Sequence, residues 1–189
     1  MERTSRVLVG YATAAGSTQS IAERISDVLR SAGATVVCRP VGPDLDPGTF
    51  DAVVLGSAVH SMAWLTPASD FLGRVPASAT NRLWCFSVGG LPHPERAGLS
   101  RWLAVRELQK IEQRFPGGRR PREHRMFAGI VDLTGLPLWG RLFFRATGGA
   151  SGDQRDWPAI EAWAADIASQ LEDSARPEQP GRMHRPSAG

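Results

Sequence analysis

The sequence has little of several things that would have pointed to a particular class of protein. It contains two cysteines, Cys38 and Cys85, each inside a short apolar stretch. Two thiols supply neither a disulfide framework nor the ligands of a thiolate metal site, so we expect no metal and two small buried side chains. No apolar run reaches the roughly 18 to 20 residues that cross a bilayer, and the chain start does not resemble a signal peptide. We therefore expect an intracellular, cytoplasmic protein.

Lysine is also nearly absent, and the basic charge is concentrated in one part of the chain. Of the 22 basic residues only Lys110 is a lysine, and the net charge is +3. Residues 96–145 carry 11 basic and 4 acidic side chains. The densest run, Arg114 to Arg125, has the proline and glycine content of a solvated loop and no nucleic-acid-binding motif. We exclude nucleic acid as a partner, whereas an anionic membrane surface or an acidic substrate suits this charge.

Short apolar runs alternate with amphipathic segments, which is typical of a parallel sheet with helices on both faces. Strands are predicted at 6–11, 34–39, 52–56, 83–88 and 125–131. Helices are predicted at 18–32, at 66–75 with Thr66 as N-cap, at about 104–115, and after an Asp156 N-cap. The predicted buried faces of the last two helices consist of Ala104, Leu108, Ile111 and Phe115, and of Ile160, Ala164, Ile167 and Leu171. The fold class is therefore α/β, a three-layer sandwich with a five-stranded parallel sheet.

The chain length and the composition of its end indicate one domain and a tail. We expect the domain to span residues 1–173, with an inserted segment at about 133–149. Residues 174–189 contain three prolines and two glycines without periodicity, which predicts a disordered tail.

The loop after the first strand has the composition of a phosphate site. It reads Thr13-Ala14-Ala15-Gly16-Ser17-Thr18 and leads into a helix, so backbone N–H groups, hydroxyls and the positive end of the helix dipole come together. The glycine-rich dinucleotide pattern and the Gly-Lys-Ser/Thr of a P-loop are both missing, which argues against NAD(P) and ATP. A phosphate monoester fits this loop; the alternative is a capped helix after a short connection.

Two later loops should converge on the first one. In a sheet of order 2-1-3-4-5, ligands lie beyond the carboxyl ends of the strands, at the switch point between strands one and three. We expect both loops to hold a planar heterocycle through backbone polar groups and apolar side chains. Histidine exchanges protons near neutral pH, so His60 is the catalytic candidate, with a loop histidine at the pocket rim as the alternative. Trp64 is a candidate ring cover, or else an apolar staple beside Thr66. The candidate residues are Ser57, Ala58, Val59, His60 and Trp64 after the third strand, and Ser87, Val88, Gly89, Gly90 and Leu91 after the fourth.

Over residues 6–172 the sequence resembles the flavodoxin-like FMN proteins. The resemblance rests on the strand, loop and helix start at 7–22, on 53–59, on 86–88, and on 141–149 before Asp153. Within that family it is most similar to the menaquinone-dependent protoporphyrinogen IX dehydrogenases. The resemblance implies FMN, redox chemistry at the flavin N5 and a quinone acceptor.

The chain departs from its relatives at three places in the predicted site. Ala15 stands where flavodoxins carry a hydroxyl residue, and Gly89-Gly90-Leu91 stand where they carry an aromatic residue. His60 stands where the dehydrogenases tend to have a basic residue. The rival functions are an electron carrier of the flavodoxin type and a flavodoxin-like binding or regulatory domain without FMN.

One apolar segment lies outside all three loops. Residues 133–146 are aromatic and apolar, with only Arg141 and Arg145 charged. A large apolar surface of this kind implies a partner, so we expect it to face a small planar substrate, a quinone or the inner face of the membrane. The alternative is plain packing on the core. The residues assigned to this surface are Leu136, Trp139, Arg141, Phe143, Phe144 and Arg145.

Overall fold

The middle layer of the protein is a six-stranded sheet. The computed structural model describes residues 5–89, 106, 108–131 and 152–175. Five strands are parallel, in the order β2 (Thr35–Pro40), β1 (Arg6–Ala12), β3 (Ala52–His60), β5 (Leu83–Gly89) and β6 (Glu123–Ala128). The sixth, β4 (Ala63–Trp64), pairs antiparallel with β3. The predicted order 2-1-3-4-5 is therefore confirmed, because β5 and β6 are the fourth and fifth long strands.

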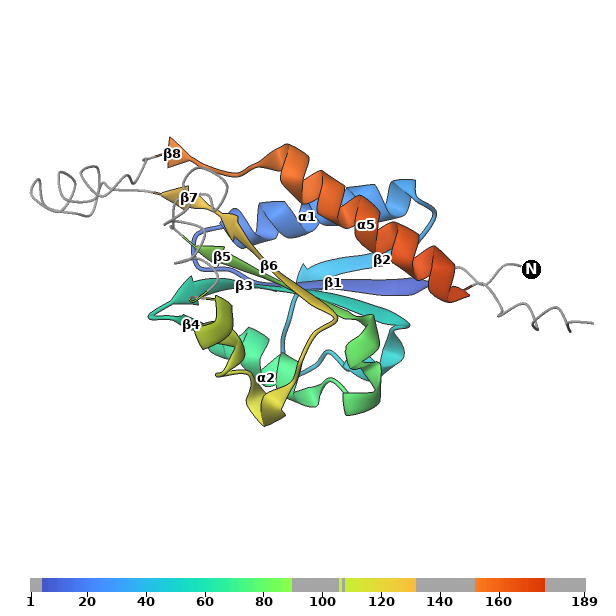
Figure 1. Ribbon diagram of the computed structural model, residues 1–189, viewed down its shortest axis with the longest axis horizontal. Coiled ribbons are helices and arrows are strands. Elements are labelled where there is room, and N and C mark those ends of the chain that lie inside the picture. Colours follow the sequence, from blue (N-terminus) through green and yellow to red (C-terminus); the bar gives the residue numbers. More distant parts are fainter. Residues whose placement is uncertain (1–4, 90–105, 107, 132–151, 176–189) are drawn as a thin grey trace, which may run out of the picture.

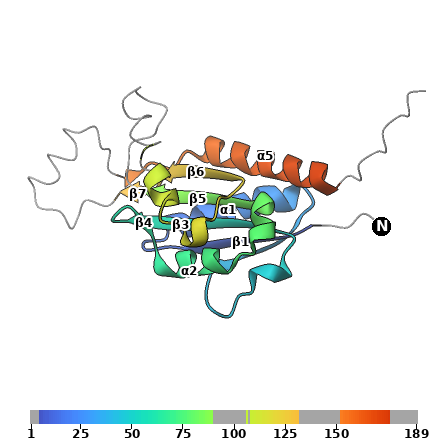
Figure 2. The ribbon, with the colours of Figure 1, turned by 60° about the horizontal axis from the view of Figure 1, so that its bottom comes forward.

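Helices cover both faces of the sheet. Figures 1 and 2 show α1 (Ser17–Ser31) and α5 (Trp157–Ala175) side by side on one face, and α2 (Thr66–Arg74) on the other. Residues 108–112 are also helical, and their Ile111 is buried on the α2 side. Three short 3₁₀ turns complete the connections: η1 (Pro47–Thr49), η2 (Ala77–Arg82) and η3 (Pro116–Gly118).

Strand alternation divides the core into two halves. Residues such as Val9, Val54 and Phe86 pack under α1 and α5, while their neighbours Leu8, Leu55 and Cys85 pack against α2. The near-continuous apolar strands reflect burial on both faces of a parallel sheet. Four further residues predicted for the inner face of the last helix, Ile160, Ala164, Ile167 and Leu171, are buried as expected.

The helix ends show where local signals worked and where one was wrong. The Asp156 Oδ1 atom accepts a hydrogen bond from the Ala159 N–H at 3.1 Å, which confirms the predicted N-cap of α5. Thr66, by contrast, lies inside α2, and the extended residue before the helix is Leu65. The Leu65 N–H donates to the Ser57 Oγ atom at 3.0 Å, and this bond fixes the chain one residue before the predicted start.

The predicted loop after the third strand is instead a hairpin. β3 continues to His60, and Ser61 and Met62 form the turn with φ values of 50° and 61° before β4 returns. The Arg114 Nη1 atom donates to the carbonyls of Ser61 and Met62 at 3.0 and 3.1 Å. Because these turn residues are not the glycine or asparagine that usually adopt positive φ, the sequence carried no hairpin signal.

The predicted fifth strand is split. β6 ends at Ala128, and β7 (Ile130–Val131) pairs antiparallel with β8 (Gly152–Asp153) in a separate two-stranded sheet. The helix expected at about 104–115 ends at Glu112, although Ile111 and Phe115 are buried as predicted. α5 runs to Ala175, two residues into the predicted tail. The remainder of that tail, residue 104 and the insertion at about 133–149 lie outside the described residues.

Candidate functional site

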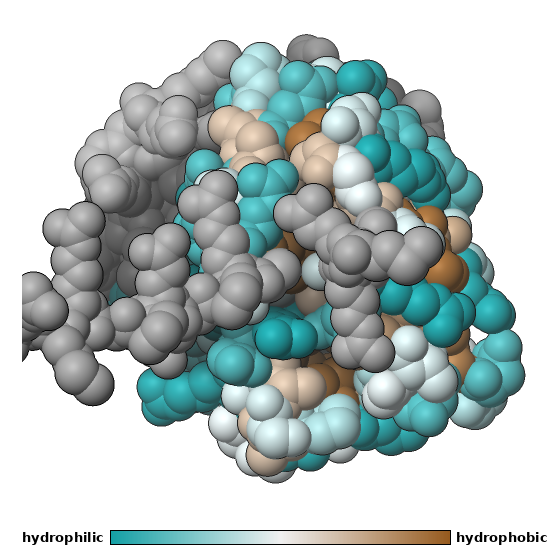
Figure 3. Space-filling model, turned by 90° about the vertical axis from the view of Figure 1, so that its right-hand side faces the viewer, coloured by the Kyte–Doolittle hydropathy of each residue, from teal (hydrophilic) through white to brown (hydrophobic). Residues whose placement is uncertain are grey.

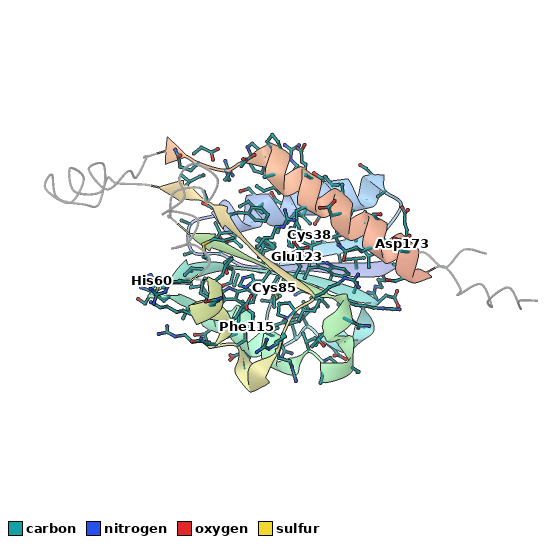
Figure 4. The ribbon with its side chains drawn as sticks, in the orientation of Figure 1. Cys38, His60, Cys85, Phe115, Glu123 and Asp173 are labelled. Carbon is teal, nitrogen blue, oxygen red and sulfur yellow. The ribbon has the colours of Figure 1, made fainter. Side chains whose placement is uncertain are left out.

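The carboxyl ends of three neighbouring strands meet at one end of the sheet. In the strand register Ala12 of β1 lies opposite Ser57 of β3, and Ala58 of β3 lies opposite Val88 of β5. Figure 4 shows His60 at this end of the molecule, well away from Cys38 and Asp173. Here the chain leaves β1 and β3 toward opposite faces of the sheet, because α1 and α2 cover different faces and β2 and β3 flank β1 on opposite sides. Ligands of open α/β sheets bind at such a point.

The loop between β1 and α1 holds backbone donors that have no acceptor within the helix. Gly16 has a φ of 88°, and its N–H donates to the Thr13 Oγ1 atom at 2.9 Å. The Ser20 N–H donates to the Gly16 carbonyl at 3.1 Å. The N–H groups of residues 17–19 therefore precede the first helical hydrogen bond and have no intrahelical acceptor. With the helix dipole, they form a site for an anion.

A second observation at the same place indicates a ligand. Thr18 is only 1% exposed, and within the described part of the chain its Oγ1 atom has no hydrogen-bond partner. Leaving a buried hydroxyl unpaired costs roughly 1–3 kcal/mol. Ala14, Ala15 and Gly16 are exposed around it. A phosphate monoester would satisfy this hydroxyl and the free N–H groups together.

The Ser17 side chain connects the first loop to the chain after β6. Its Oγ atom accepts a hydrogen bond from the Ile130 N–H at 3.1 Å, and Ser17 is 8% exposed. The Gly129 N–H also donates to the Gly89 carbonyl at 3.1 Å. These bonds attach the chain after β6 to both the first loop and the end of β5. The Ser17 hydroxyl is therefore engaged with the protein itself.

No sequence pattern pointed to Arg155, whose side chain also reaches the first turn of α1. Its Nη1 atom donates to the Ser20 Oγ atom at 2.6 Å, across a separation of 135 residues. Its Nε atom donates to Asp153 at 2.7 Å, and the guanidinium lies 4.5 Å from the centre of the Trp157 ring. These bonds to Arg155 lower the pKa of Asp153 to about 2. No local pattern marks such a contact, because its two halves lie far apart in the chain.

Both serines predicted to contact the ring turn away from the ligand end of the sheet. Ser57 and Ser87 are 0% exposed and lie two residues after Leu55 and Cys85, on the face that packs against α2. The Ser57 Oγ atom donates to the Ala58 carbonyl at 2.9 Å and accepts from the Leu65 N–H. The Ser57 and Ser87 hydroxyls therefore stabilise the protein's own fold, and their backbone groups are what these two residues could offer a ligand.

Ser87 belongs to a chain of hydrogen bonds that starts at the buried Trp64 and ends at the exposed Glu112. The Trp64 Nε1–H donates to the Ser87 Oγ atom at 2.7 Å, and Ser87 Oγ lies 2.9 Å from His124 Nε2. The His124 Nδ1 atom lies 3.0 Å from Glu112 Oε1. With Nδ1 protonated, His124 donates to Glu112 and accepts from Ser87, so every member is satisfied. The order Ser-His-Glu is that of a hydrolase, but the buried Ser87 cannot reach a substrate in this conformation.

Trp64 is a core residue rather than a ring cover. It is 7% exposed, and the centre of its ring lies 4.7 Å from that of Phe115 and 5.8 Å from that of His124. Figure 4 shows Phe115 on the α2 side of the sheet. The prediction that Trp64 covers a flavin is therefore wrong for this conformation, because β4 turns its side chain under the sheet.

The remaining candidates at this end offer mainly backbone groups. Ala58 and Val59 are half-buried, and His60 is exposed at the tip of the hairpin. Val88 is buried in the core under α1 and α5, while Gly89 is half-buried and has open space where a side chain would stand. Gly90 and Leu91 lie outside the described residues, as do all six residues assigned to a substrate or membrane surface: Leu136, Trp139, Arg141, Phe143, Phe144 and Arg145.

The described residues form neither a metal site nor a membrane-spanning helix. They contain no group of three or more His, Cys, Asp or Glu side chains placed to hold a metal ion. None of the described helices combines the length and hydrophobicity that a membrane span requires. Figure 3 views the end of the molecule opposite the candidate site, where the coloured surface is mostly hydrophilic with small, separate hydrophobic areas.

Comparison with known proteins gives the family. The model of the flavodoxin domain matches residues 8–156, so the chain belongs to the flavodoxin domain family. FMN is the cofactor of that family, as the sequence predicted. A comparison with curated proteins finds no match.

Solved structures agree on the fold. A flavodoxin from the domain Archaea is 14% identical with a TM-score of 0.51, and the match covers 88% of this chain and 99% of that one. Flavodoxin 2 from Bacillus cereus is 16% identical with a TM-score of 0.53, covering 87% of this chain and 99% of that one. The flavodiiron core of Flv1 from Synechocystis sp. PCC6803 is 16% identical with a TM-score of 0.51, covering 90% of this chain but only 37% of that protein. At these identities the structures show the fold, and the family match supports an electron-transfer or oxidoreductase role of the FMN type.

Proposed function

We propose that this protein binds FMN with the phosphate at residues 13–18 and acts as an FMN-dependent oxidoreductase. The buried, unpaired Thr18 hydroxyl at the start of α1 carries the proposal, because a phosphate oxygen is the partner that it lacks. The free N–H groups of residues 17–19 and the hydroxyl of Thr13 would hold the same phosphate. When bound, FMN supplies the redox chemistry, and the protein binds, orients and tunes it.

The ring side of the site would act mainly through its backbone. The carboxyl ends of β3, at 58–60, and of β5, at Gly89, would offer peptide groups to the ring. The nearby Ser57 and Ser87 hydroxyls are already used under the sheet. His60 is the exposed side chain that could donate a hydrogen bond to a substrate or exchange a proton with it. We keep it as the catalytic candidate.

For the substrate, we propose protoporphyrinogen with a quinone as acceptor. The support is the sequence resemblance at 53–59, 86–88 and 141–149, together with the basic charge of residues 96–145, which suits the carboxylates of a porphyrin. The same charge supports peripheral contact with an anionic membrane face. The apolar segment at 133–146 would provide the surface for such a bulky substrate.

The test is oxidation of protoporphyrinogen under anaerobic conditions. The FMN-loaded protein is mixed with protoporphyrinogen IX and menadione, and porphyrin fluorescence is recorded. We expect turnover with the wild type and with Gly33→Asp, and loss of turnover with Gly16→Asp. Porphyrin formation no faster than with free FMN would overturn the substrate proposal.

An electron carrier is the second candidate, because the chain covers 99% of the length of solved flavodoxins. The net charge of +3 weighs against it, since carriers of this family usually present acidic surfaces. A carrier would pass electrons from a reduced donor to a small dye while leaving protoporphyrinogen untouched. A protein that stays colourless after incubation with FMN and gel filtration would contradict both redox functions and favour a binding domain without FMN.

A further inference from the structure

A mostly buried guanidinium lies beside the phosphate loop. The Arg155 side chain is 14% exposed and donates through Nη1 to Ser20, whose own Oγ lies 2.9 Å from the Ser17 carbonyl and 3.3 Å from the Gly16 carbonyl. Helical side chains lean toward the helix N-terminus, so Ser20 brings this cation to the first turn of α1. Three of the five guanidinium N–H donors are used by Ser20 and Asp153.

Asp153 compensates this charge. It receives hydrogen bonds from the backbone N–H, Nε and Nη2 of Arg155, and these bonds keep it ionised at neutral pH. The carboxylate is 47% exposed, while the guanidinium is largely shielded from solvent. A phosphate at the start of α1 would thus meet one attractive and one repulsive charge, both held in place by the same hydrogen bonds.

We propose that the Arg155–Asp153 pair sets the preference of this site for a phosphate-bearing flavin over an uncharged one. This inference rests on the proposed FMN site and adds a charge-selecting element to it. Arg155 strengthens the attraction for a phosphate dianion, and Asp153 limits it. A purely structural pair would instead affect all flavins alike, because it would act only through the shape of the loop.

The protein contains a second arginine–carboxylate pair nearby that serves as a control. Arg24 of α1 and Glu161 of α5 form an ion pair at 3.1 Å, and Arg24 lies 5.3 Å from the centre of the Trp157 ring that Arg155 also contacts. This pair joins α1 to α5 and lies about one turn beyond Ser20 along α1. Its variants remove an ion pair of the same type without changing the charge at the loop.

The experiment compares the dissociation constants of FMN and riboflavin, measured by flavin fluorescence at low and high salt. We expect Arg155→Gln to weaken FMN about tenfold and riboflavin by less than about threefold. The selectivity is the dissociation constant of riboflavin divided by that of FMN. Asp153→Asn should raise this ratio and tighten FMN binding about threefold, and the effects of both substitutions should shrink at high salt. Arg24→Gln and Glu161→Gln should leave the ratio unchanged, and Arg155→Lys should retain part of the selectivity.

The opposite signs make the outcome decisive. If both Arg155→Gln and Asp153→Asn weaken FMN and riboflavin equally, the pair is structural and the inference is overturned. If Arg155→Gln fails to fold, Arg155→Lys and Asp153→Asn still test the sign. FMN binding by the wild type with an unchanged ratio in all variants overturns this inference alone, whereas no binding of either flavin overturns the proposed function as well.

Discussion

Polar side chains have opposite roles in two stretches at the carboxyl end of the sheet, the β1–α1 loop and the ends of β3 and β5. In the β1–α1 loop the Thr18 hydroxyl is buried and unpaired, and the N–H groups of residues 17–19 have no helical acceptor. At the ends of β3 and β5, the Ser57 and Ser87 hydroxyls are fully engaged under the sheet. The first stretch thus has hydrogen-bond donors that an anion would satisfy. In the second stretch the hydroxyls stabilise the fold itself. The ligand's charge and its ring are therefore expected to be recognised by different means.

The largest effect should come from placing a negative charge in the first stretch. Gly16 and Gly33 flank α1 with φ values of 88° and 90°, and neither has an atom within 4 Å of where a Cβ would stand. Aspartate at either position pays a similar backbone cost. Only Gly16→Asp should repel the phosphate, and we expect FMN affinity to fall about a hundredfold or more by fluorescence titration. Equal losses in Gly16→Asp and Gly33→Asp would show that the phosphate lies elsewhere.

The second stretch should respond in stability and hardly in FMN binding. Ser87→Ala leaves the Trp64 Nε1–H and the buried His124 Nε2 without their partner, which should lower the free energy of unfolding by about 2 kcal/mol in urea. FMN affinity of the folded protein should change less than about threefold. Ser31→Ala at an exposed helical position is the control, with an effect under about 0.5 kcal/mol. A large loss of FMN affinity with unchanged stability would assign Ser87 to the ligand after all.

Thr18→Val tests whether the unpaired Thr18 hydroxyl binds the phosphate. The substitution keeps the shape and removes the unpaired hydroxyl, so the protein without flavin should be as stable as the wild type or more stable by about 1 kcal/mol. FMN should nevertheless bind about tenfold more weakly. Thr35→Val, at an exposed position of β2, should change neither quantity. Destabilisation without any change in FMN affinity would indicate that the hydroxyl serves the fold.

The smallest expected effect is a pH dependence at the margin of the site. The bonds from Arg155 lower the pKa of Asp153 from 3.8 to about 2, so the stabilisation is present above about pH 4 and is lost as the pH falls toward 2. Because this carboxylate is 47% exposed, the effect should stay below about 1 kcal/mol. Urea midpoints between about pH 5 and about pH 3 should fall less steeply in Asp153→Asn than in the wild type. Parallel curves would show that the pair contributes nothing to folding.

The sequence was sufficient for most features whose information is local, the Thr66 N-cap being an exception. The strands could be predicted because burial on both faces makes them continuous apolar runs, and Asp156 could be predicted as an N-cap from its own position. The β1–α1 loop could be proposed as a phosphate site for the same reason, since all its groups are consecutive. Arg155 could not be found, because it meets Ser20 across 135 residues.

The differences at the ring side have two physical origins. Arg114 donates to the carbonyls of Ser61 and Met62 from a distant part of the chain, and no local pattern marks the hairpin in which β3 passes its predicted end and Trp64 is buried. The place of the Ser57 and Ser87 hydroxyls could have been foreseen: two residues after Leu55 and Cys85, strand alternation assigns both serines to the α2 face.

The two outermost strands of the sheet bear on how this protein meets others. β2 ends in Pro40, which has no N–H to offer, and Arg39 beside it pairs with Asp44 at 2.9 Å. β6 at the opposite edge carries Glu123 and Arg125, which pair at 2.6 Å. Proline and charge on an outer strand discourage another chain from adding to it. Edge-to-edge aggregation is thus opposed on both sides, and a partner protein has to approach the ends of the strands or the helical faces.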